Sequence, residues 1–374
     1  MNGHGATIET PPAEAGPQTA GAARVWRWLD SRLGLDALSY PVPTHANTLL
    51  YTLGGITAFG FLVLIASGIY LAQFYDPQPA TARDSVIYIL QSVRFGAFVR
   101  GVHFWTANLV VVTAGLHLVR VYASGAYKRP REVNWLVGLA LFATTIGFVF
   151  TGTVLKWDQE AWEALGHNQA IGELLGGFGT WFTSGFTRSV PLLTRLFVAH
   201  VAILPALFAL LLALHFALVK RHGISGLPGR HESEGPRSDT AVAIADEGAS
   251  TFTVHLRHLV GFGLLLTAAV GALTLLFGSP LGAAITPGPE QTQPPWMFLP
   301  FFTLENWWGI KALLWAPALL FAVLVLVPFV DRSPVKTMRQ RKAVLIAGTV
   351  LLIVLVVLGV LAATTPAQTH LEMG

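Results

Sequence analysis

The sequence predicts a polytopic all-α membrane protein, from its composition and from the length of its uncharged stretches. Of the 374 residues, 53% are hydrophobic and 12% are charged, and the mean hydropathy is +0.57. Soluble domains carry about a quarter charged residues, so a soluble globular fold is excluded. Seven stretches lack Asp, Glu, Lys and Arg and approach the ~20 residues that one helical crossing needs. They run over 47–72, 101–119, 133–155, 196–219, 259–278, 312–330 and 343–363.

Basic residues are spread unevenly over the six connections between these stretches. The second, fourth and sixth connections (120–132, 220–257 and 331–342) hold 14 Lys and Arg, whereas the first, third and fifth (73–100, 156–195 and 278–311) hold 7. Connections rich in Lys and Arg stay in the cytoplasm, so we expect a cytoplasmic N-terminus and an external C-terminus. The net charge of +4 is therefore a topology signal, and we expect no nucleic acid partner.

The chain divides into five expected regions. Residues 1–46 form a cytoplasmic tail without the apolar core of a signal peptide. Within it, 25–38 have apolar residues near helical spacing, which predicts a short interfacial helix, with a solvated linker as the alternative. A four-helix domain (47–226) is followed by a cytoplasmic linker (227–257) rich in Gly, Ser, Pro and charges. A three-helix domain (258–364) and a tail (365–374) complete the chain.

The absence of cysteine limits the cofactors that this chain can hold. With no Cys, it has no c-type haem attachment, no Cys-ligated iron–sulfur cluster and no disulfide. It also lacks a phosphate-binding loop and a GxGxxG motif in a βαβ unit. Nothing therefore favours an ATP-driven pump or a nicotinamide enzyme.

Four of the twelve histidines lie inside the uncharged stretches, where ionisable side chains are costly and functional by default. His103 and His117 are 14 residues apart in the second stretch, and His200 and His215 are 15 apart in the fourth. Each separation puts both residues roughly on one helix face, ~21 to 22 Å apart. The two helices run in the same direction, so His103 is level with His200 near the outer surface and His117 with His215 near the inner one.

Two facing imidazoles at one depth suit the two axial positions of a haem iron. A core histidine bonded to a neighbouring helix is the alternative for any one residue, but two matched pairs argue against it. Zinc would need four tetrahedral ligands close together.

Glycine and arginine positions support the same interpretation. Gly54 and Gly68 in the first stretch, and Gly138 and Gly152 in the third, are also 14 residues apart. A residue without a side chain permits close approach of a flat macrocycle, although general helix packing explains any single glycine. Cations that suit haem propionates, or that snorkel to the interface, stand near the histidines at the predicted membrane boundaries. These are Arg100, Arg120 and Arg195.

From about Val42 to Val330 the chain resembles the cytochrome b family of quinol-oxidising respiratory and photosynthetic complexes. The resemblance rests on Leu53-Gly-Gly-Ile56, Arg100-Gly-Val-His103, His117-Leu-Val-Arg120, Lys128-Arg-Pro-Arg-Glu132, Trp157-Asp-Gln159, Leu193-Thr-Arg195 with His200 and His215, and Gly223-Ile-Ser-Gly226. The spacing of 15 and the Lys128–Glu132 and Gly223–Gly226 runs look like the chloroplast-type branch. There the three C-terminal helices are usually a separate small subunit, so this chain resembles a fusion of the two.

The resemblance implies electron transfer across the membrane between quinol and quinone sites. It implies two non-covalent b haems, the outer held by His103 and His200 and the inner by His117 and His215. It also implies a Rieske-type iron–sulfur partner, a cytochrome c or other electron acceptor, a homodimer and, for this chain, a prokaryotic inner membrane. By position, Asp36 and Lys220 match residues of the inner quinone pocket, where a charged side chain can relay protons.

The expected outer quinol site departs from the family pattern. The family's Pro-Glu-Trp-Tyr reads Pro294-Pro295-Trp296-Met297, its Leu-Pro-Trp reads Leu155-Lys156-Trp157, and Thr52 replaces the cysteine that attaches an extra haem in the chloroplast type. Quinol oxidation still needs a proton acceptor, for which the nearest carboxylates are Glu290 and Glu305, with Trp296 between them. We favour Glu305, because the Phe298–Phe302 run and Trp307-Trp308 would bury it and raise its pKa. An interfacial carboxylate beside a Trp belt is the alternative.

Two other functions remain open from the sequence alone. The chain could conduct electrons between quinone and a periplasmic oxidoreductase without bifurcation. It could also be a haem-free seven-helix transporter with proton-relaying histidines, although the matched His and Gly spacings argue against that.

Overall fold

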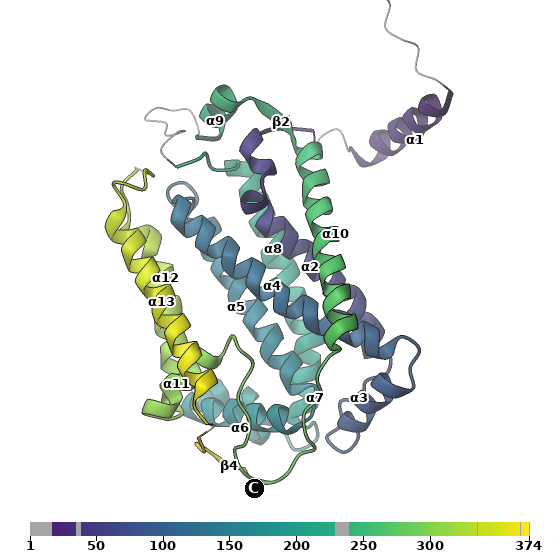
Figure 1. The fold of residues 1–374 in the computed structure, drawn as a ribbon, viewed down its shortest axis with the longest axis vertical. Helices are drawn as coiled ribbons and strands as arrows, with labels where there is room; N and C mark the ends of the chain where they lie inside the picture. The colour runs from purple at the N-terminus through teal and green to yellow at the C-terminus, as the bar shows by residue number, and fades with distance from the viewer. Residues whose placement is uncertain (1–16, 35–38, 229–238, 335, 367, 374) are drawn as a thin grey trace, which may run out of the picture.

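Residues 17–34, 39–228, 239–334, 336–366 and 368–373 are described in the structure, a computed structural model (Figure 1). In this part of the chain seven helices are long and apolar enough to cross a membrane, which confirms the predicted polytopic all-α class. They are α2 (Leu49–Ala72), α4 (Gly96–Ser124), α5 (Glu132–Val154), the continuous helix Leu192–His222, α10 (Phe252–Phe277), α12 (Lys311–Val330) and α13 (Lys342–Thr364). The fourth of these is made of α7 (Leu192–Val198), the π-helical turn η5 (Ala199–Ile203) and α8 (Leu204–His222).

The spanning helices pack around a central group of four. Helix α2 packs along α4, and α5 packs along α8. Helix α10 lies against α2 and α4, whereas α12 lies against α5, and the short helix α11 (Leu299–Trp308) contacts both α12 and α13 (Figure 1). The three C-terminal spanning helices are therefore placed on two sides of the central group. Their outward side chains are apolar, as expected where lipid is the solvent.

The two ends of the bundle carry different elements (Figure 1). One end, here called the α6 end, has α3 (Ala82–Gln91), α6 (Gln159–Leu174), the 3-10 turns η3 (Gly176–Phe182) and η4 (Ser184–Phe186), and α11. The other, called the α9 end, has β1 (Pro41–Pro43), η2 (Thr44–Asn47), α9 (Asp239–Glu247) and β2 (Ala249–Thr251). Strands β1 and β2 pair antiparallel. The Asp158 carboxylate caps α6 by accepting from the backbone N–H of Ala161 (3.0 Å) and also accepts from Gly282 (2.8 Å), so it joins α6 to the loop after α10.

The N-terminal helix and the expected linker differ from the sequence predictions. Helix α1 covers Pro17–Leu33 rather than 25–38, and Asp36 lies outside the described residues. The stretch 227–257 contains α9 and β2, and α10 already begins at Phe252. Asp239 of α9 forms ion pairs with Arg131 (2.9 Å) and Lys336. The charged residues of this stretch predict a linker by composition. In the structure one of them, Asp239, instead anchors the stretch to two other parts of the chain.

The C-terminal tail returns to the α6 end. Strand β4 (Glu372–Met373) pairs antiparallel with β3 (Gly288–Pro289), in the loop that follows α10. The Gln293 side chain donates to the carbonyls of Ala362 (3.0 Å) and Thr365 (2.8 Å). The end of α13 and this loop are therefore fastened together.

Candidate functional site

The four histidines of the spanning helices face each other in two pairs. The ring centroids of His103 and His200 are 6.3 Å apart, and those of His117 and His215 are 6.5 Å apart. Metal–imidazole bonds of about 2 Å on opposite sides of one metal atom leave ring centroids about 6 Å apart. Each pair therefore has the separation at which two imidazoles hold one metal atom between them. We call His103 and His200 the first pair, and His117 and His215 the second pair.

A π-helical turn explains why the two pairs match although their sequence spacings differ. His200 lies in η5, the only π-helical segment in the described part of the chain, and His103 and His117 lie in the regular helix α4. Pro205 lies two residues after the end of η5 and has no N–H for the preceding turn, which is a common cause of such irregularity. The π turn takes up one additional residue, so a spacing of 15 in this helix corresponds to a spacing of 14 in α4.

Each of the four glycines contacts a different histidine ring. A Cβ atom added to any of them would lie 3.0–3.6 Å from the Cε1 atom of that histidine. The contacts are Gly54 with His117 (3.0 Å), Gly68 with His103 (3.3 Å), Gly152 with His200 (3.1 Å) and Gly138 with His215 (3.6 Å). The first pair is thus held between α2 and α5 at one level, and the second pair between the same helices at the other.

Two hydroxyl groups orient the first pair, and sequence reasoning missed both. Ser67 Oγ lies 3.0 Å from Nδ1 of His103, and Thr151 Oγ1 lies 2.8 Å from Nδ1 of His200. Each hydroxyl donates to a backbone carbonyl four residues earlier, so it accepts from the histidine Nδ1–H. The opposite nitrogen of each ring would then be the one available to bind a metal. The available signal was that each hydroxyl residue immediately precedes one of the spaced glycines.

The three predicted arginines have different surroundings. Arg120 is stacked over the ring of Tyr51, with Cζ 3.4 Å from the ring centroid, and its buried Nε and Nη2 have no hydrogen-bond partner among the described residues. Arg100 donates to Ser279 and to the carbonyl of Pro280. Arg195 donates to the carbonyls of Trp181 and Thr183. Arg120 therefore fits an anionic group best, since unpaired buried donors are costly.

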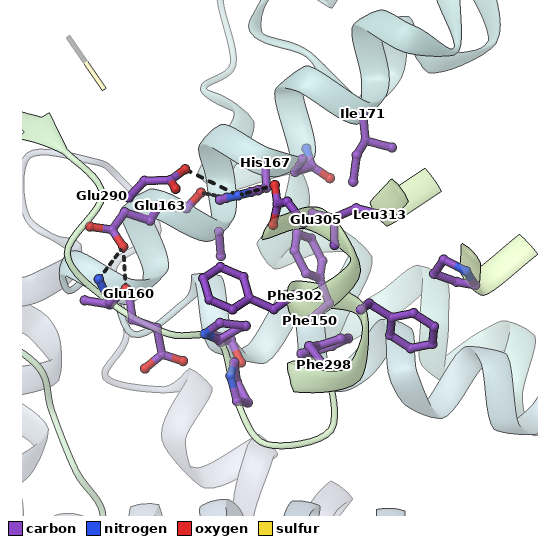
Figure 2. Close-up of a pocket in the computed structure, with 18 of the residues that line it drawn as sticks. Phe150, Glu160, Glu163, His167, Ile171, Glu290, Phe298, Phe302, Glu305 and Leu313 are labelled. Atoms are coloured by element: carbon purple, nitrogen blue, oxygen red, sulfur yellow. Dashed lines mark hydrogen bonds and ion pairs between the residues drawn. The ribbon is translucent and has the colours of Figure 1, made fainter. Parts of the chain in front are cut away.

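A largely apolar cavity of about 360 Å³ lies at the α6 end, between α6, the loop 290–298 and α11 (Figure 2). Aromatic rings form one side of it, including Phe150, Phe298 and Phe302. Phe150 and Thr153 of α5 line the cavity, while the intervening Thr151 and Gly152 contact His200. The last turns of α5 therefore separate the cavity from the first histidine pair.

The polar side of the cavity brings together two acids and a histidine (Figure 2). His167 Nε2 is 3.0 Å from Glu305 Oε1 and 3.3 Å from Glu290 Oε1. Glu305 is completely buried. Burial alone would lower the pKa of His167, but Glu305, the carbonyl of Glu163 and Glu290 raise it from 6.5 to about 9. His167 is therefore a cation at neutral pH, and both carboxylates that were candidates from the sequence adjoin it.

The neighbouring Glu163 has a different role, because all its acceptor positions are engaged. Its carboxylate accepts from the Gln159 side chain, from the backbone N–H groups of Gln291 and Thr292, and from the Thr292 hydroxyl. It thereby fixes the loop beside the cavity to α6. The sequence gives no signal for His167 or Glu163, because both acquire partners more than a hundred residues away.

Two other predicted residues lie apart from the cavity lining. The Trp296 indole donates to Asn108 Oδ1 (2.8 Å) and is half exposed. Lys220 is exposed at the α9 end, with Nζ 5.9 Å from the Tyr40 ring centroid. Asp36, the other residue expected to line the inner quinone pocket, is outside the described residues, so this pocket remains an expectation.

Facing imidazoles inside a membrane bundle, cradled by glycines, define the class of membrane cytochromes with bis-histidine haem sites. Arg120 adds two buried donors that have no partner among the described residues. The family model described as cytochrome b/b6/petB matches residues 37–223, and the model for cytochrome b(C-terminal)/b6/petD matches 283–374. This chain belongs to the cytochrome b family, and haem b binding follows from that membership. The two matches also confirm that one chain carries both the b6-like and the C-terminal part.

Curated relatives and a solved structure agree with this assignment. The menaquinol:cytochrome c reductase cytochrome b subunit of Bacillus subtilis (strain 168) is 37% identical over 219 residues, which are 54% of this chain and 98% of the relative. The cytochrome b6 of Heliobacterium mobile is 38% identical over 208 residues, 53% of this chain and 98% of the relative. A chain of a hyperthermophilic respiratory Complex III has a TM-score of 0.73 at 25% identity, covering 91% of this chain and 92% of that one.

Proposed function

We propose that this chain is the dihaem cytochrome b subunit of a membrane quinol:electron acceptor oxidoreductase. The observation that carries the proposal is the presence of two opposed histidine pairs, each contacted by one glycine from α2 and one from α5. Haem, when bound, supplies one-electron transfer. The chain's own residues hold the two groups at two depths of one bundle, so that electrons can cross the membrane between quinol and quinone.

Replacement of the histidines one at a time tests the proposal. The wild-type chain should contain two non-covalent haems by pyridine haemochrome titration and show low-spin spectra, because both axial ligands are imidazoles. His103→Leu and His200→Leu should each remove one haem, and His117→Leu and His215→Leu the other. His258→Leu, at an exposed position on α10, is the matched control and should retain both. A chain that keeps two haems after loss of any of the four paired histidines would refute the pairing.

Quinol oxidation is assigned to the cavity beside α6. Oxidising a quinol releases two protons, and a site that excludes water needs a group that accepts one as the electron leaves. Pro295 and Met297 cannot accept one, but the buried Glu305 carboxylate faces the cavity beside His167. The residues of α5 that line the cavity adjoin those that contact His200, which favours electron transfer to the first pair. Glu305 thus supplies the carboxylate that the family pattern places where this chain has Pro295.

Glutamine substitutions test this assignment. Glu305→Gln should slow the reduction of haem by quinol about 100-fold, the lower range for loss of a general base, and leave both haem spectra intact. Glu290→Gln should have a smaller effect, because Glu290 also bonds to the tail. Glu173→Gln, on the exposed face of the same helix as His167, should behave as wild type. Unchanged quinol oxidation in both Glu305→Gln and Glu290→Gln would refute a carboxylate acceptor and favour the non-bifurcating conduit.

The orientation and partners follow from the same proposal. The α6 end faces outward and the α9 end faces the cytoplasm, as the distribution of Lys and Arg indicates. Reporter fusions at Ser233 should therefore read cytoplasmic and fusions at Gly374 external. An external reading at Ser233 would overturn this topology and exchange the outer and inner assignments of the two haems. The partners are a Rieske-type iron–sulfur protein and a cytochrome c or other acceptor, in a homodimer in a prokaryotic inner membrane. Lys220 and Asp36 serve the inner quinone site.

A further inference from the structure

The C-terminal tail brings a second histidine to the polar side of the cavity. The backbone N–H of His370 donates to Glu290 Oε2 (3.0 Å), and its ring Nδ1 lies 3.3 Å from the same oxygen and 4.0 Å from Glu305 Oε1. Its ring also packs edge-on against Phe302, at 5.8 Å between centroids. The pairing of β4 with β3 holds the tail in this position. His370 is therefore a fixed neighbour of both candidate carboxylates.

Several buried polar atoms of this cluster lack a well-oriented hydrogen bond in the described part of the chain. They are Nε2 of His167, Oε1 of Glu290 and both carboxylate oxygens of Glu305. Such atoms are costly to bury, yet here Glu290 Oε1 and Glu305 Oε1 both lie within ion-pair distance of His167 Nε2. Groups of this kind, placed close together and incompletely satisfied, suit the exchange of protons rather than the fixing of a loop.

The other carboxylates near the cavity are already engaged. Glu163 accepts four hydrogen bonds that hold the loop, and Glu160 forms an ion pair with Lys156 at 2.6 Å. His370 does not line the cavity itself, but it contacts Glu290, which does. The exposed fraction of the side chain is 0% for Glu305, 15% for His167, which lines the cavity, 2% for Glu290 and 10% for His370. The polar groups thus form a continuous series of contacts from the cavity to the tail.

We propose that His370 is the exit group of a proton relay that runs from Glu305 through His167 and Glu290 to the external water. The inference rests on the proposed oxidation of quinol in this cavity. One quinol O–H bond breaks, its proton forms an O–H bond on Glu305, and the electron leaves to the oxidised acceptors of the complex. His167 passes its own Nε2 proton to Glu290 and regains one from Glu305. Glu290 then protonates His370 at Nδ1, and His370 releases a proton to water.

Chemical rescue distinguishes a relay from a structural contact. In the intact complex in membranes, with a short-chain quinol as donor, His370→Ala should lower the rate of quinol oxidation roughly tenfold, below the full loss of a general base because water still reaches Glu290. Added imidazole, at millimolar concentration, should restore most of the rate, since it can occupy the vacated space and carry protons. His370→Gln keeps a polar side chain that neither takes up nor releases a proton, and should be as slow as His370→Ala. His258→Ala, on α10 at the α9 end, is the matched control and should be neither slowed nor accelerated by imidazole.

Each outcome bears on the relay. Loss of rate in both His370 variants, with imidazole rescue and a new dependence on buffer concentration, supports it. A wild-type rate in His370→Ala, or a full rate in His370→Gln, overturns it. A loss that imidazole does not restore shows that the tail only shapes the cavity, which also overturns it. If Glu305→Gln and Glu290→Gln both have no effect, the proposed quinol site itself fails, whereas a slow Glu305→Gln with a normal His370→Ala refutes the relay alone.

Discussion

Exchange of Glu305 for glutamine should change how the stability of the protein depends on pH. Glutamine keeps the size of the side chain and removes its charge. In the wild type, His167 faces Glu305 from α11 and Glu290 from the loop, while its Nδ1 donates to the carbonyl of Glu163 on its own helix (2.9 Å). His370 adjoins Glu290 on the other side. Burial lowers the pKa of His167, and the surrounding acceptors raise it to about 9.

The size of the effect follows from that pKa. A rise from 6.5 to about 9 corresponds to about 3 kcal/mol at 1.36 kcal/mol per pKa unit. The His167 side chain is 15% exposed, so screening by solvent reduces this value only modestly. Because the pKa is raised in the folded state, the stabilisation is fully present below pH 6.5 and is lost as the pH rises through 9. Without the Glu305 charge, the pKa of His167 should fall and most of this dependence should disappear.

Thermal unfolding of the purified chain, followed by intrinsic fluorescence at pH 6.5 and pH 9.5, measures this difference. The Tm of the wild type should fall by several degrees more than that of Glu305→Gln, since about 3 kcal/mol is large on the scale of Tm shifts. Other groups that titrate in this range contribute equally to the change in Tm of both proteins, so the difference between the variants removes their contribution. Glu173→Gln should match the wild type, because its exposed carboxylate is on α6 but away from His167. An equal fall of Tm in the wild type and in Glu305→Gln would refute the ion pair.

Two further substitutions test the first histidine pair and the contacts of Asp331, which join the end of α12 to the loop after α4 and to Arg341. Ser67→Ala should weaken haem binding at the His103–His200 pair about tenfold, the lower range for loss of a group that orients a metal ligand, measured as haem loss to a scavenging protein; Thr57→Val on the same helix should have no such effect. Asp331→Asn should lower the free energy of unfolding by about 3 to 5 kcal/mol, because Asp331 forms buried contacts with Lys128 (2.7 Å), Arg341 (3.2 Å) and Tyr127 (2.6 Å). Thermal unfolding checks this, with Asp84→Asn as the surface control. An unchanged Tm in Asp331→Asn would show that these contacts do not stabilise the fold.

The sequence predicts the spanning helices and the histidine and glycine pattern because both depend on local periodicity. Apolar length reveals a membrane helix, and a repeat of 14 residues reveals a common face. The same reasoning places His200 and His215 only roughly on a common face, because a spacing of 15 runs past four helical turns. It cannot foresee that a π turn before Pro205 takes up the additional residue. That correction depends on hydrogen bonding within the turn and not on any periodic pattern.

The cavity is harder to predict because its polar groups come from distant parts of the chain. Glu305 was identified by elimination within one loop, whereas His167 belongs to a helix that the hydropathy pattern does not mark and His370 to an expected tail. Arg100 shows the opposite problem. Its place near His103 favours a propionate, but the structure gives its donors to Ser279 and Pro280. Sequence proximity to a ligand is therefore a weak guide where a loop competes for the same donors.

The division of the chain between its two family matches explains where each part of the function lies. All four paired histidines fall within residues 37–223, the part matched by the cytochrome b/b6/petB model. The cavity, in contrast, takes His167 from that part and Glu305 from residues 283–374. The residues proposed to hold haem thus lie in the first part alone, whereas the proposed proton-accepting site forms only where the two parts meet. Joining them in one chain keeps the second part at a high effective concentration beside the first, and the contacts of Asp239 with Arg131 and Lys336 hold the connecting segment against both parts.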